Sequence, residues 1–145
     1  MHDLLTIPYY TEYEPLEFKT DGAIAADLHV RGDHTIQQGE THVLKTGLYL
    51  GLEDGVYAEV TMRSSYAKKG LFIPNAPGLI DTDYRGEIMI IVANLKKTPV
   101  EIVDGHRIAQ IKFKRRDPLK LVRLSNKSMM SETKRGSGGL GSTGR

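Results

Sequence analysis

The amino-acid sequence predicts an all-β domain, either a sandwich or a barrel. Short segments of strand character follow one another, and turn-forming glycine and aspartate residues separate them. The pattern is clearest in residues 56–63, where apolar and polar side chains alternate from Val56 to Arg63, the period of a half-buried strand. Many short strands at such spacing are typical of sandwiches and barrels.

The remaining elements follow from similar local patterns. Further strands are expected at residues 23–30, 41–50, 101–103, 107–113 and 119–123. One short helix is expected at residues 65–69, and Gly70 stands where a helix commonly ends.

A strand at residues 88–93 is apolar on both faces and should be buried on both. Either it is the central strand of one sandwich, or its second face packs against other subunits around a symmetry axis.

The composition is that of a single domain. With 145 residues, of which 39% are hydrophobic, the chain can bury a core of its own. It has no cysteine, which excludes disulfides and thiolate metal sites and suits a reducing cytoplasm. The first residues lack an export signal, and no apolar run approaches the roughly 18 residues of a membrane span. We therefore expect a cytoplasmic protein, in a host cell if viral, that binds no membrane.

The composition changes near residue 126. Residues 126–145 carry four basic residues against one acidic residue, a net charge of +3, within a chain of net charge +2. They are rich in glycine and poor in large apolar residues, so we expect a domain at residues 1–125 and a flexible arm at 126–145. A solubilising tail would have the same composition. A basic arm on a near-neutral body favours a small anionic partner over nucleic acid.

The densest polar cluster lies at residues 78–86. Asp81 and Asp83 stand there with Tyr84 and Arg85, beside the apolar strand at 88–93. Charges next to apolar surroundings must be paired, hydrated or linked to a metal, and functional sites often gather such groups. A turn with solvated aspartates is the alternative reading. We expect this segment to form a hairpin that Asp83 and Arg85 support, through an ion pair or other contacts.

Two segments are candidates for binding phosphate. Residues 63–65, Arg-Ser-Ser, bring a guanidinium, two hydroxyls and helix N–H groups together, although Ser64 could be only a helix cap. Residues 135–144 have the glycine spacing of a Walker loop, but Ser142 stands in place of its lysine and no helix follows. Arg135 could still pair with a terminal phosphate.

Five motifs, in order along the chain, resemble those of the trimeric dUTPases, the dUTP pyrophosphatases. They are Ala25-Ala26-Asp27-Leu28, Arg63-Ser64-Ser65, residues 75–86, residues 105–110 and residues 135–144. The resemblance implies a jelly-roll β domain assembled as a homotrimer with shared active sites. It also implies hydrolysis of dUTP to dUMP and pyrophosphate, which limits uracil incorporation into DNA and supplies dUMP.

The same resemblance implies roles for single residues. Asp81 would contact the deoxyribose and orient or deprotonate the water that attacks the α-phosphorus, and Tyr84 would exclude a 2′-hydroxyl. The uracil would be bound by Asn75 and Met89, by the backbone of Gly78, Leu79, Ile80 and Asp81, and by Leu140 as a cap. The phosphates would be held by Arg63, Ser64, Ser65, Gln110, Arg135, Gly141, Ser142 and Thr143. Asp27 would contact a water bound to Mg²⁺, an ion that prefers oxygen ligands and accompanies polyphosphates.

The chain departs from the family pattern at four positions. Leu140 replaces a phenylalanine that stacks on the uracil, so closure over the base should be weaker. His106 replaces an acidic residue and should sit in an exposed turn, while Ala26 and Ser65 each replace a glycine. The five histidines lack the HxH and HExxH spacings, so we expect them to face solvent and to form no zinc site.

Two other functions remain open from the sequence. One is a dCTP deaminase or bifunctional enzyme of similar fold, which release of ammonia from dCTP would reveal. The other is a non-catalytic trimer that senses nucleotides and regulates a partner.

Overall fold

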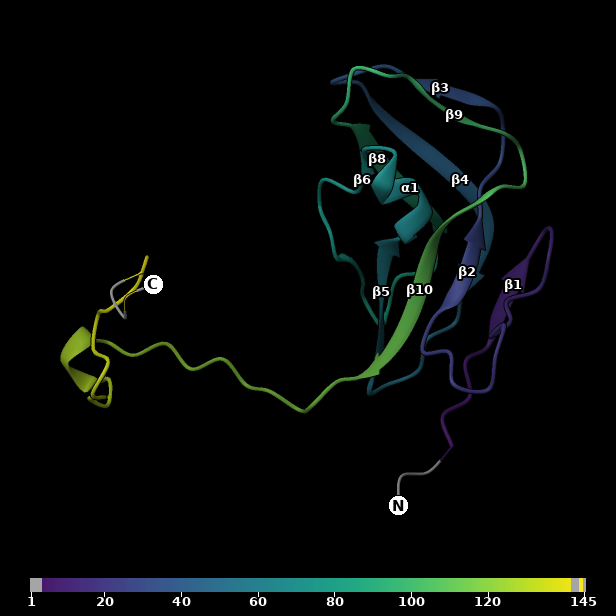
Figure 1. Ribbon diagram of the computed structural model, residues 1–145. Coiled ribbons are helices and arrows are strands. Elements are labelled where there is room, and N and C mark those ends of the chain that lie inside the picture. Colours follow the sequence, from purple (N-terminus) through teal and green to yellow (C-terminus); the bar gives the residue numbers. More distant parts are fainter. Residues whose placement is uncertain (1–3, 142–143, 145) are drawn as a thin grey trace.

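The computed structural model of the chain describes residues 4–141 and residue 144. Strands dominate it (Figure 1). In chain order the described elements are β1 (Tyr9–Thr11), β2 (Ala26–His29), β3 (His34–Ile36), β4 (Thr41–Leu50), β5 (Val56–Met62), α1 (Ser64–Lys68), β6 (Leu71–Phe72), β7 (Gly78–Ile80), β8 (Glu87–Asn94), β9 (Val100–Ile102), β10 (Arg107–Arg115) and the 3₁₀ helix η1 (Lys127–Met129).

Antiparallel pairing joins the strands into two four-stranded sheets and one two-stranded sheet. The first large sheet has the order β1-β4-β8-β6, the second has the order β2-β10-β5-β7, and β3 pairs with β9. The inward side chains of both large sheets form one apolar core, in which Leu28, Leu44, Ile88 and Ile111 are almost fully buried. The predicted all-β, jelly-roll-like sandwich with one short helix is therefore confirmed.

Most predicted strands are present within a few residues of the expected bounds. The ranges expected at 41–50, 56–63, 88–93, 101–103 and 107–113 correspond to β4, β5, β8, β9 and β10, and the range 23–30 shortens to β2. Four strands of only two or three residues, β1, β3, β6 and β7, were not predicted; so short a segment shows no period, and among strands of this length only β9 was predicted.

The strand predicted at residues 119–123 is wrong within this chain. Leu119, Leu121 and Val122 are 70–97% exposed, and the segment after β10 leads away from the sheets (Figure 1). A strand needs a neighbouring strand for its hydrogen bonds, and this segment has none within the described chain. Whether residues 126–145 form a flexible arm that closes over an active site stays a prediction.

The predicted helix is confirmed as α1, shifted by one residue. Lys69 caps its C-terminus, and Gly70 follows with a positive φ of 99°. Only glycine adopts this backbone conformation without strain. A side chain at this position would also lie 2.7 Å from Cγ of Lys96.

Strand β8 buries one face only. Ile88, Ile90 and Val92 point into the core, but Met89 and Ile91 on the other face are 47% and 37% exposed. Val43 of β4 lies opposite Ile91 in the sheet and is 55% exposed. The expected burial of both faces is not met within one chain, and contact of this second face with other subunits stays a prediction. None of the described helices is long and apolar enough to cross a membrane.

Candidate active site

Residues 75–86, here called the hairpin, comprise β7 and the turn that leads into β8; β7 and β8 belong to different sheets, so the name describes the turn of the chain and not a pair of strands. A groove of about 440 Å³ lies between this polar hairpin and β8. Seven residues predicted to bind substrate line this groove: Asn75, Gly78, Leu79, Ile80, Asp81, Tyr84 and Met89. The hairpin motif and the apolar strand therefore meet in one concave surface. Chemically, the groove offers a carboxylate and a phenol above an apolar floor.

The sheet topology explains why a groove forms here. The short β6 pairs only with Ala93 and Asn94, so it covers only the end of β8. In the other sheet, β7 pairs with β5 and forms the edge of the sheet. The edges of the two sheets thus flank an opening, and inward side chains such as Val60 and Ile90 form its floor.

The hairpin is held by its own backbone and by Arg85. The Tyr84 N–H donates to the Asp81 carbonyl at 3.1 Å, which closes the turn. The Arg85 guanidinium donates to the carbonyls of Thr82 at 2.8 Å and Leu52 at 2.9 Å. Arg85 therefore supports the hairpin as expected, although no ion pair joins it to Asp83 in the described residues.

The Asp81 carboxylate and the Tyr84 hydroxyl differ in whether a hydrogen bond holds them in place. Asp81 is exposed at the groove, and its carboxylate has no hydrogen bond or ion pair with another described residue. Tyr84, in contrast, is fixed, because its hydroxyl donates to the Glu87 carbonyl at 2.7 Å. The free carboxylate of Asp81 can accept a proton from a bound reactant. The fixed ring of Tyr84 beside it limits the size of the ligand that fits there.

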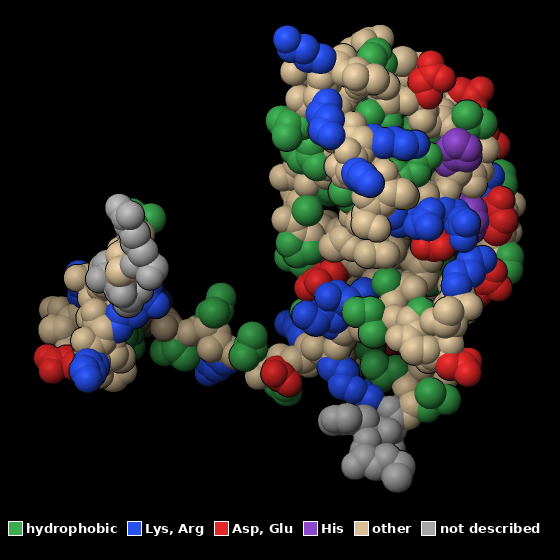
Figure 2. Space-filling model, viewed as in Figure 1, with side chains coloured by type: hydrophobic (Ala, Val, Ile, Leu, Met, Phe, Trp, Pro, Cys, Tyr) green, Lys and Arg blue, Asp and Glu red, His purple; other side chains and the backbone are tan. Residues whose placement is uncertain are grey.

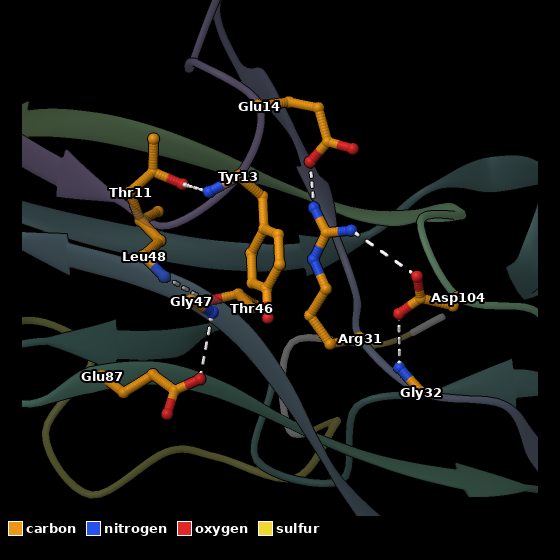
Figure 3. Close-up of polar contacts among 10 residues, drawn as sticks. All are labelled: Thr11, Tyr13, Glu14, Arg31, Gly32, Thr46, Gly47, Leu48, Glu87 and Asp104. Atoms are coloured by element: carbon orange, nitrogen blue, oxygen red, sulfur yellow. Dashed lines mark hydrogen bonds and ion pairs between the residues drawn. The ribbon is translucent and has the colours of Figure 1, made fainter.

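Glu87 lines the groove and connects it to Gly47 of β4 (Figure 3). Its carboxylate accepts a hydrogen bond from the Gly47 N–H at 3.0 Å, at an irregularity in the pairing of β4 with β8. Gly47 has a positive φ of 70°, and a side chain there would lie 2.6 Å from the Tyr13 ring. Glu87 was not predicted as a site residue, although a glycine inside a strand is a signal of such an irregularity.

Arg31 anchors the N-terminal segment against this region (Figure 3). Its guanidinium lies 3.6 Å from the centre of the Tyr13 ring, pairs with Glu14 and is 3.8 Å from a carboxylate oxygen of Asp104. Burial alone would raise the pKa of Glu14, but hydrogen bonding and the Arg31 charge hold this pKa below its ordinary value.

A second cluster forms around Asp27 on β2. One carboxylate oxygen lies 3.4 Å from Nε of Arg63, and the other lies 3.1 Å from a terminal nitrogen of Arg107. Gln110 is the cross-strand neighbour of both Asp27 and Thr61, and its amide donates to the Thr61 hydroxyl at 3.2 Å. The structure thus brings together three predicted residues from separate motifs and adds Arg107, which the sequence analysis gave no role.

The start of α1 lies next to this cluster. Arg63 is the N-cap residue of the helix, and its side chain donates to the Arg107 carbonyl at 2.8 Å instead of capping the helix. Ser64 and Ser65 are exposed in the first turn. The reading of Ser64 as a mere helix cap is therefore wrong.

A hydrogen bond joins α1 to the fourth motif. The Tyr66 hydroxyl lies 2.8 Å from Nδ1 of His106, which is exposed in a turn as expected. Burial raises the pKa of Tyr66. The expectation that the histidines face solvent is wrong for three of them, because His29, His34 and His42 are half-buried, the last two against each other. The Ala26 methyl group fits where glycine is usual, since Ala26 is 2% exposed within the core.

Comparison with known proteins identifies the family. The dUTPase family model matches residues 12–144. The chain belongs to the dUTPase family. It is 40% identical over 134 residues to the deoxyuridine 5′-triphosphate nucleotidohydrolase of Rickettsia felis, a match that covers 88% of this chain and 86% of that relative. The corresponding protein of Neorickettsia sennetsu is 34% identical over 144 residues, covering 97% of this chain and 95% of that relative.

Solved dUTPase structures share the fold. The native EIAV dUTPase matches with a TM-score of 0.72 and 26% identity, covering 84% of this chain and 98% of that chain. The dUTPase of Staphylococcus bacteriophage 80alpha with dUPNHPP matches with a TM-score of 0.84 and 20% identity, covering 97% of this chain and 99% of that chain. A mutant dUTPase of phage phi11, whose structure describes a structural Mg(II) ion, matches with a TM-score of 0.75 and 17% identity, covering 86% of this chain and 100% of that chain.

The predicted site residues fall into two groups within this one chain. Asp27, Arg63 and Gln110 do not line the groove. The geometry of β5 explains this separation, because successive side chains of a strand point to opposite faces. Val60 therefore faces the groove, while the next residue, Thr61, contacts Gln110.

The fifth dUTPase motif is separate from both groups. Arg135 donates from Nε to the Gly138 carbonyl at 2.7 Å, and Leu140 is fully exposed. Neither residue lines the groove, nor does Gly141. The predicted phosphate ligands Ser142 and Thr143 lie outside the described residues.

The chain offers few groups to a resident metal ion. Across residues 4–141 and residue 144, no three histidine, cysteine or acidic side chains gather where they could hold one. The carboxylate of Asp27 is already paired with two guanidinium groups, whose charge opposes a directly bound dication. The residues therefore fit Mg²⁺ only through bound water, with phosphate oxygens as its main ligands.

Proposed function

We propose that this chain hydrolyses dUTP to dUMP and pyrophosphate, in a homotrimer whose active sites combine residues of different subunits. The observation that carries the proposal is the groove, where residues from the hairpin and from β8 gather around the unpaired carboxylate of Asp81. Relatives up to 41% identical are deoxyuridine 5′-triphosphate nucleotidohydrolases.

The carboxylate of Asp81 would act as the general base. It accepts a proton from a water molecule while the water oxygen forms a bond to the α-phosphorus. The bond between this phosphorus and the bridging oxygen to the β-phosphorus breaks, and pyrophosphate leaves with the electron pair. Asp81 suits this role because no arginine or lysine pairs with it in the described chain.

The fixed position of Tyr84 would select deoxyribose. Its hydroxyl is tied to the backbone of Glu87, so the ring cannot easily move aside for a 2′-hydroxyl. Asn75 and the backbone of residues 78–81 would bind the uracil edge, with Met89 beside it.

The cluster around Asp27 would bind the phosphate chain. Arg63 and Gln110 belong to this cluster, and Ser64 and Ser65 follow Arg63 with exposed side chains; all four can donate hydrogen bonds to phosphate oxygens. Mg²⁺ would be held by those phosphates, with Asp27 contacting one of its waters. When bound, the ion neutralises negative charge on the leaving pyrophosphate.

Three features support assembly. The groove and the phosphate-binding cluster are separate within one chain, so a complete site needs residues from a neighbour. The apolar side chains of Val43, Met89 and Ile91 form an exposed strip that another subunit would cover. The exposed segment after β10 reaches beyond its own sheets, as a segment that contacts a neighbour would.

An assay with four nucleotides tests the proposal. The purified protein is given dUTP, dCTP, dTTP or UTP, with and without Mg²⁺, and pyrophosphate and ammonia are measured. We expect pyrophosphate from dUTP alone, faster with Mg²⁺. Asp81→Asn should abolish turnover but still bind nucleotide, because an amide cannot accept the water proton. Ammonia from dCTP would indicate a deaminase, and binding without turnover by the wild type would indicate a nucleotide sensor.

A further inference from the structure

We infer that His34 and His42 form a two-histidine site for a transition-metal ion such as Zn²⁺ or Cu²⁺, separate from the nucleotide site. His34 begins β3 and His42 lies near the start of β4, on either side of the turn at residues 37–40. Their Nδ1 atoms lie 3.4 Å apart. Neither residue lines the groove or contacts the Asp27 cluster.

The partners of the other ring nitrogens determine where the protons lie. Nε2 of His34 is 3.3 Å from the Arg31 carbonyl, which can only accept a hydrogen bond, so this Nε2 carries a proton. Nε2 of His42 is 3.8 Å from a Glu40 carboxylate oxygen, which is too far for a hydrogen bond, so the neutral His42 ring carries its proton on Nδ1 and donates it to Nδ1 of His34. A metal ion that displaces this proton would meet an Nδ1 lone pair on each ring, and the His42 proton would move to Nε2 on the side of Glu40.

The hydrogen-bonded pair therefore offers two nitrogen ligands once a metal ion replaces the proton between them. The observed separation suits a metal ion. With zinc–nitrogen distances of about 2.0–2.1 Å and a tetrahedral angle, two ligating nitrogens lie about 3.4 Å apart. The structure thus holds the two rings at the spacing of adjacent ligands.

Outer contacts keep the rings in this orientation. The Glu40 carboxylate oxygen near His42 also accepts a hydrogen bond from the Gln37 N–H at 2.6 Å, so the turn fixes its position. A carboxylate behind one ligating histidine and a backbone carbonyl behind the other are the usual supports of metal-bound imidazole.

The ligand set decides the class of metal. Imidazole suits zinc, copper and nickel, whereas magnesium prefers oxygen, so the Mg²⁺ expected with the nucleotide should not compete. With two protein ligands the other coordination positions belong to water, and the His42 side chain, 25% exposed, is open to solvent. The affinity should be modest and highest for Cu²⁺.

Calorimetric titration of the full-length, chelator-treated protein tests the site. We expect one Zn²⁺ or Cu²⁺ per chain and a higher melting temperature with the metal. His42→Gln should bind about tenfold more weakly or worse, because half of the protein ligands are lost. His29→Gln is the matched control, since His29 is a half-buried histidine outside the pair, and should bind as the wild type does. His34→Gln should repeat the loss and guards against misfolding of a single variant, with circular dichroism as the check.

Two results would overturn the inference. One is equal binding by His42→Gln and the wild type. The other is a wild type that binds neither Zn²⁺ nor Cu²⁺ when the metal is in excess.

Discussion

Gly86→Ala tests whether the position of the Tyr84 ring controls activity. A methyl group on Gly86 would lie 2.5 Å from the Tyr84 hydroxyl oxygen and 2.7 Å from Cζ. Ordinary contacts between such atoms are about 3.5 Å or more, so the ring must move by about 1 Å. Tyr84 is 39% exposed, which leaves room for its tip to swing outward.

The structure predicts a small loss of stability and a larger loss of activity. Moving the ring breaks the 2.7 Å hydrogen bond to the Glu87 carbonyl, which contributes about 1 kcal/mol. A displacement of about 1 Å near the reacting groups can lower turnover by up to about a hundredfold. We expect kcat/KM for dUTP to fall roughly ten- to a hundredfold, and the preference for dUTP over UTP to shrink.

The assay combines urea unfolding with steady-state kinetics on dUTP and UTP. Gly22→Ala is the control, because a methyl group there would meet no atom within 4 Å and the backbone has no positive φ. The control should match the wild type in both measurements. If Gly86→Ala kept wild-type turnover and nucleotide preference, the proposed role of the Tyr84 ring would be refuted.

Three further predictions address the rest of the chain. Asn94→Leu should lower the free energy of unfolding by about 3 kcal/mol in urea, because Asn94 is 1% exposed and makes three hydrogen bonds of 2.9 Å with backbone groups; a loss below about 1 kcal/mol would contradict this reasoning. Burial lowers the pKa of His29 in the folded chain, so on acidification the unfolded chain binds a proton at this histidine before the folded chain does. The free energy of unfolding should therefore fall as the pH drops below about 6.5. His29→Gln should flatten that part of the stability curve, and an unchanged slope would exclude this histidine as its cause. Deletion of the residues after Thr133 should leave a folded protein with slow dUTP hydrolysis, whereas full activity would reduce the arm to a solubilising tail.

Local sequence patterns predicted the long strands because, in each of them, the pattern of buried and exposed side chains repeats over several residues. β5 alternates between core and outer face, and the apolar run of β8 reflects a strand with one face in the core and one exposed apolar face. β1, β3 and β7 are three residues long and could not show such a repeat. The segment at 119–123 has strand composition, but the described chain provides no neighbour for it.

The site was predictable where its residues are consecutive. Asn75 to Tyr84 share one hairpin, so their gathering around a groove follows from the chain itself. Arg107 and Glu87 were missed because the register of the paired strands, and not proximity along the sequence, brings each of them to its partner. Arg107 reaches Asp27 through the pairing of β10 with β2, and Glu87 reaches Gly47 through an irregularity in β4.

In the proposed homotrimer, the separation of the groove from the Asp27 cluster should allow two damaged chains to rescue each other. A chain altered at Asp81 keeps its arginines, and a chain altered at Arg63 keeps its carboxylate. When both are refolded together, mixed trimers would include sites built from the two undamaged halves. Neither parent preparation would contain such a site, so activity that appears only after mixing would show that more than one chain builds each catalytic unit.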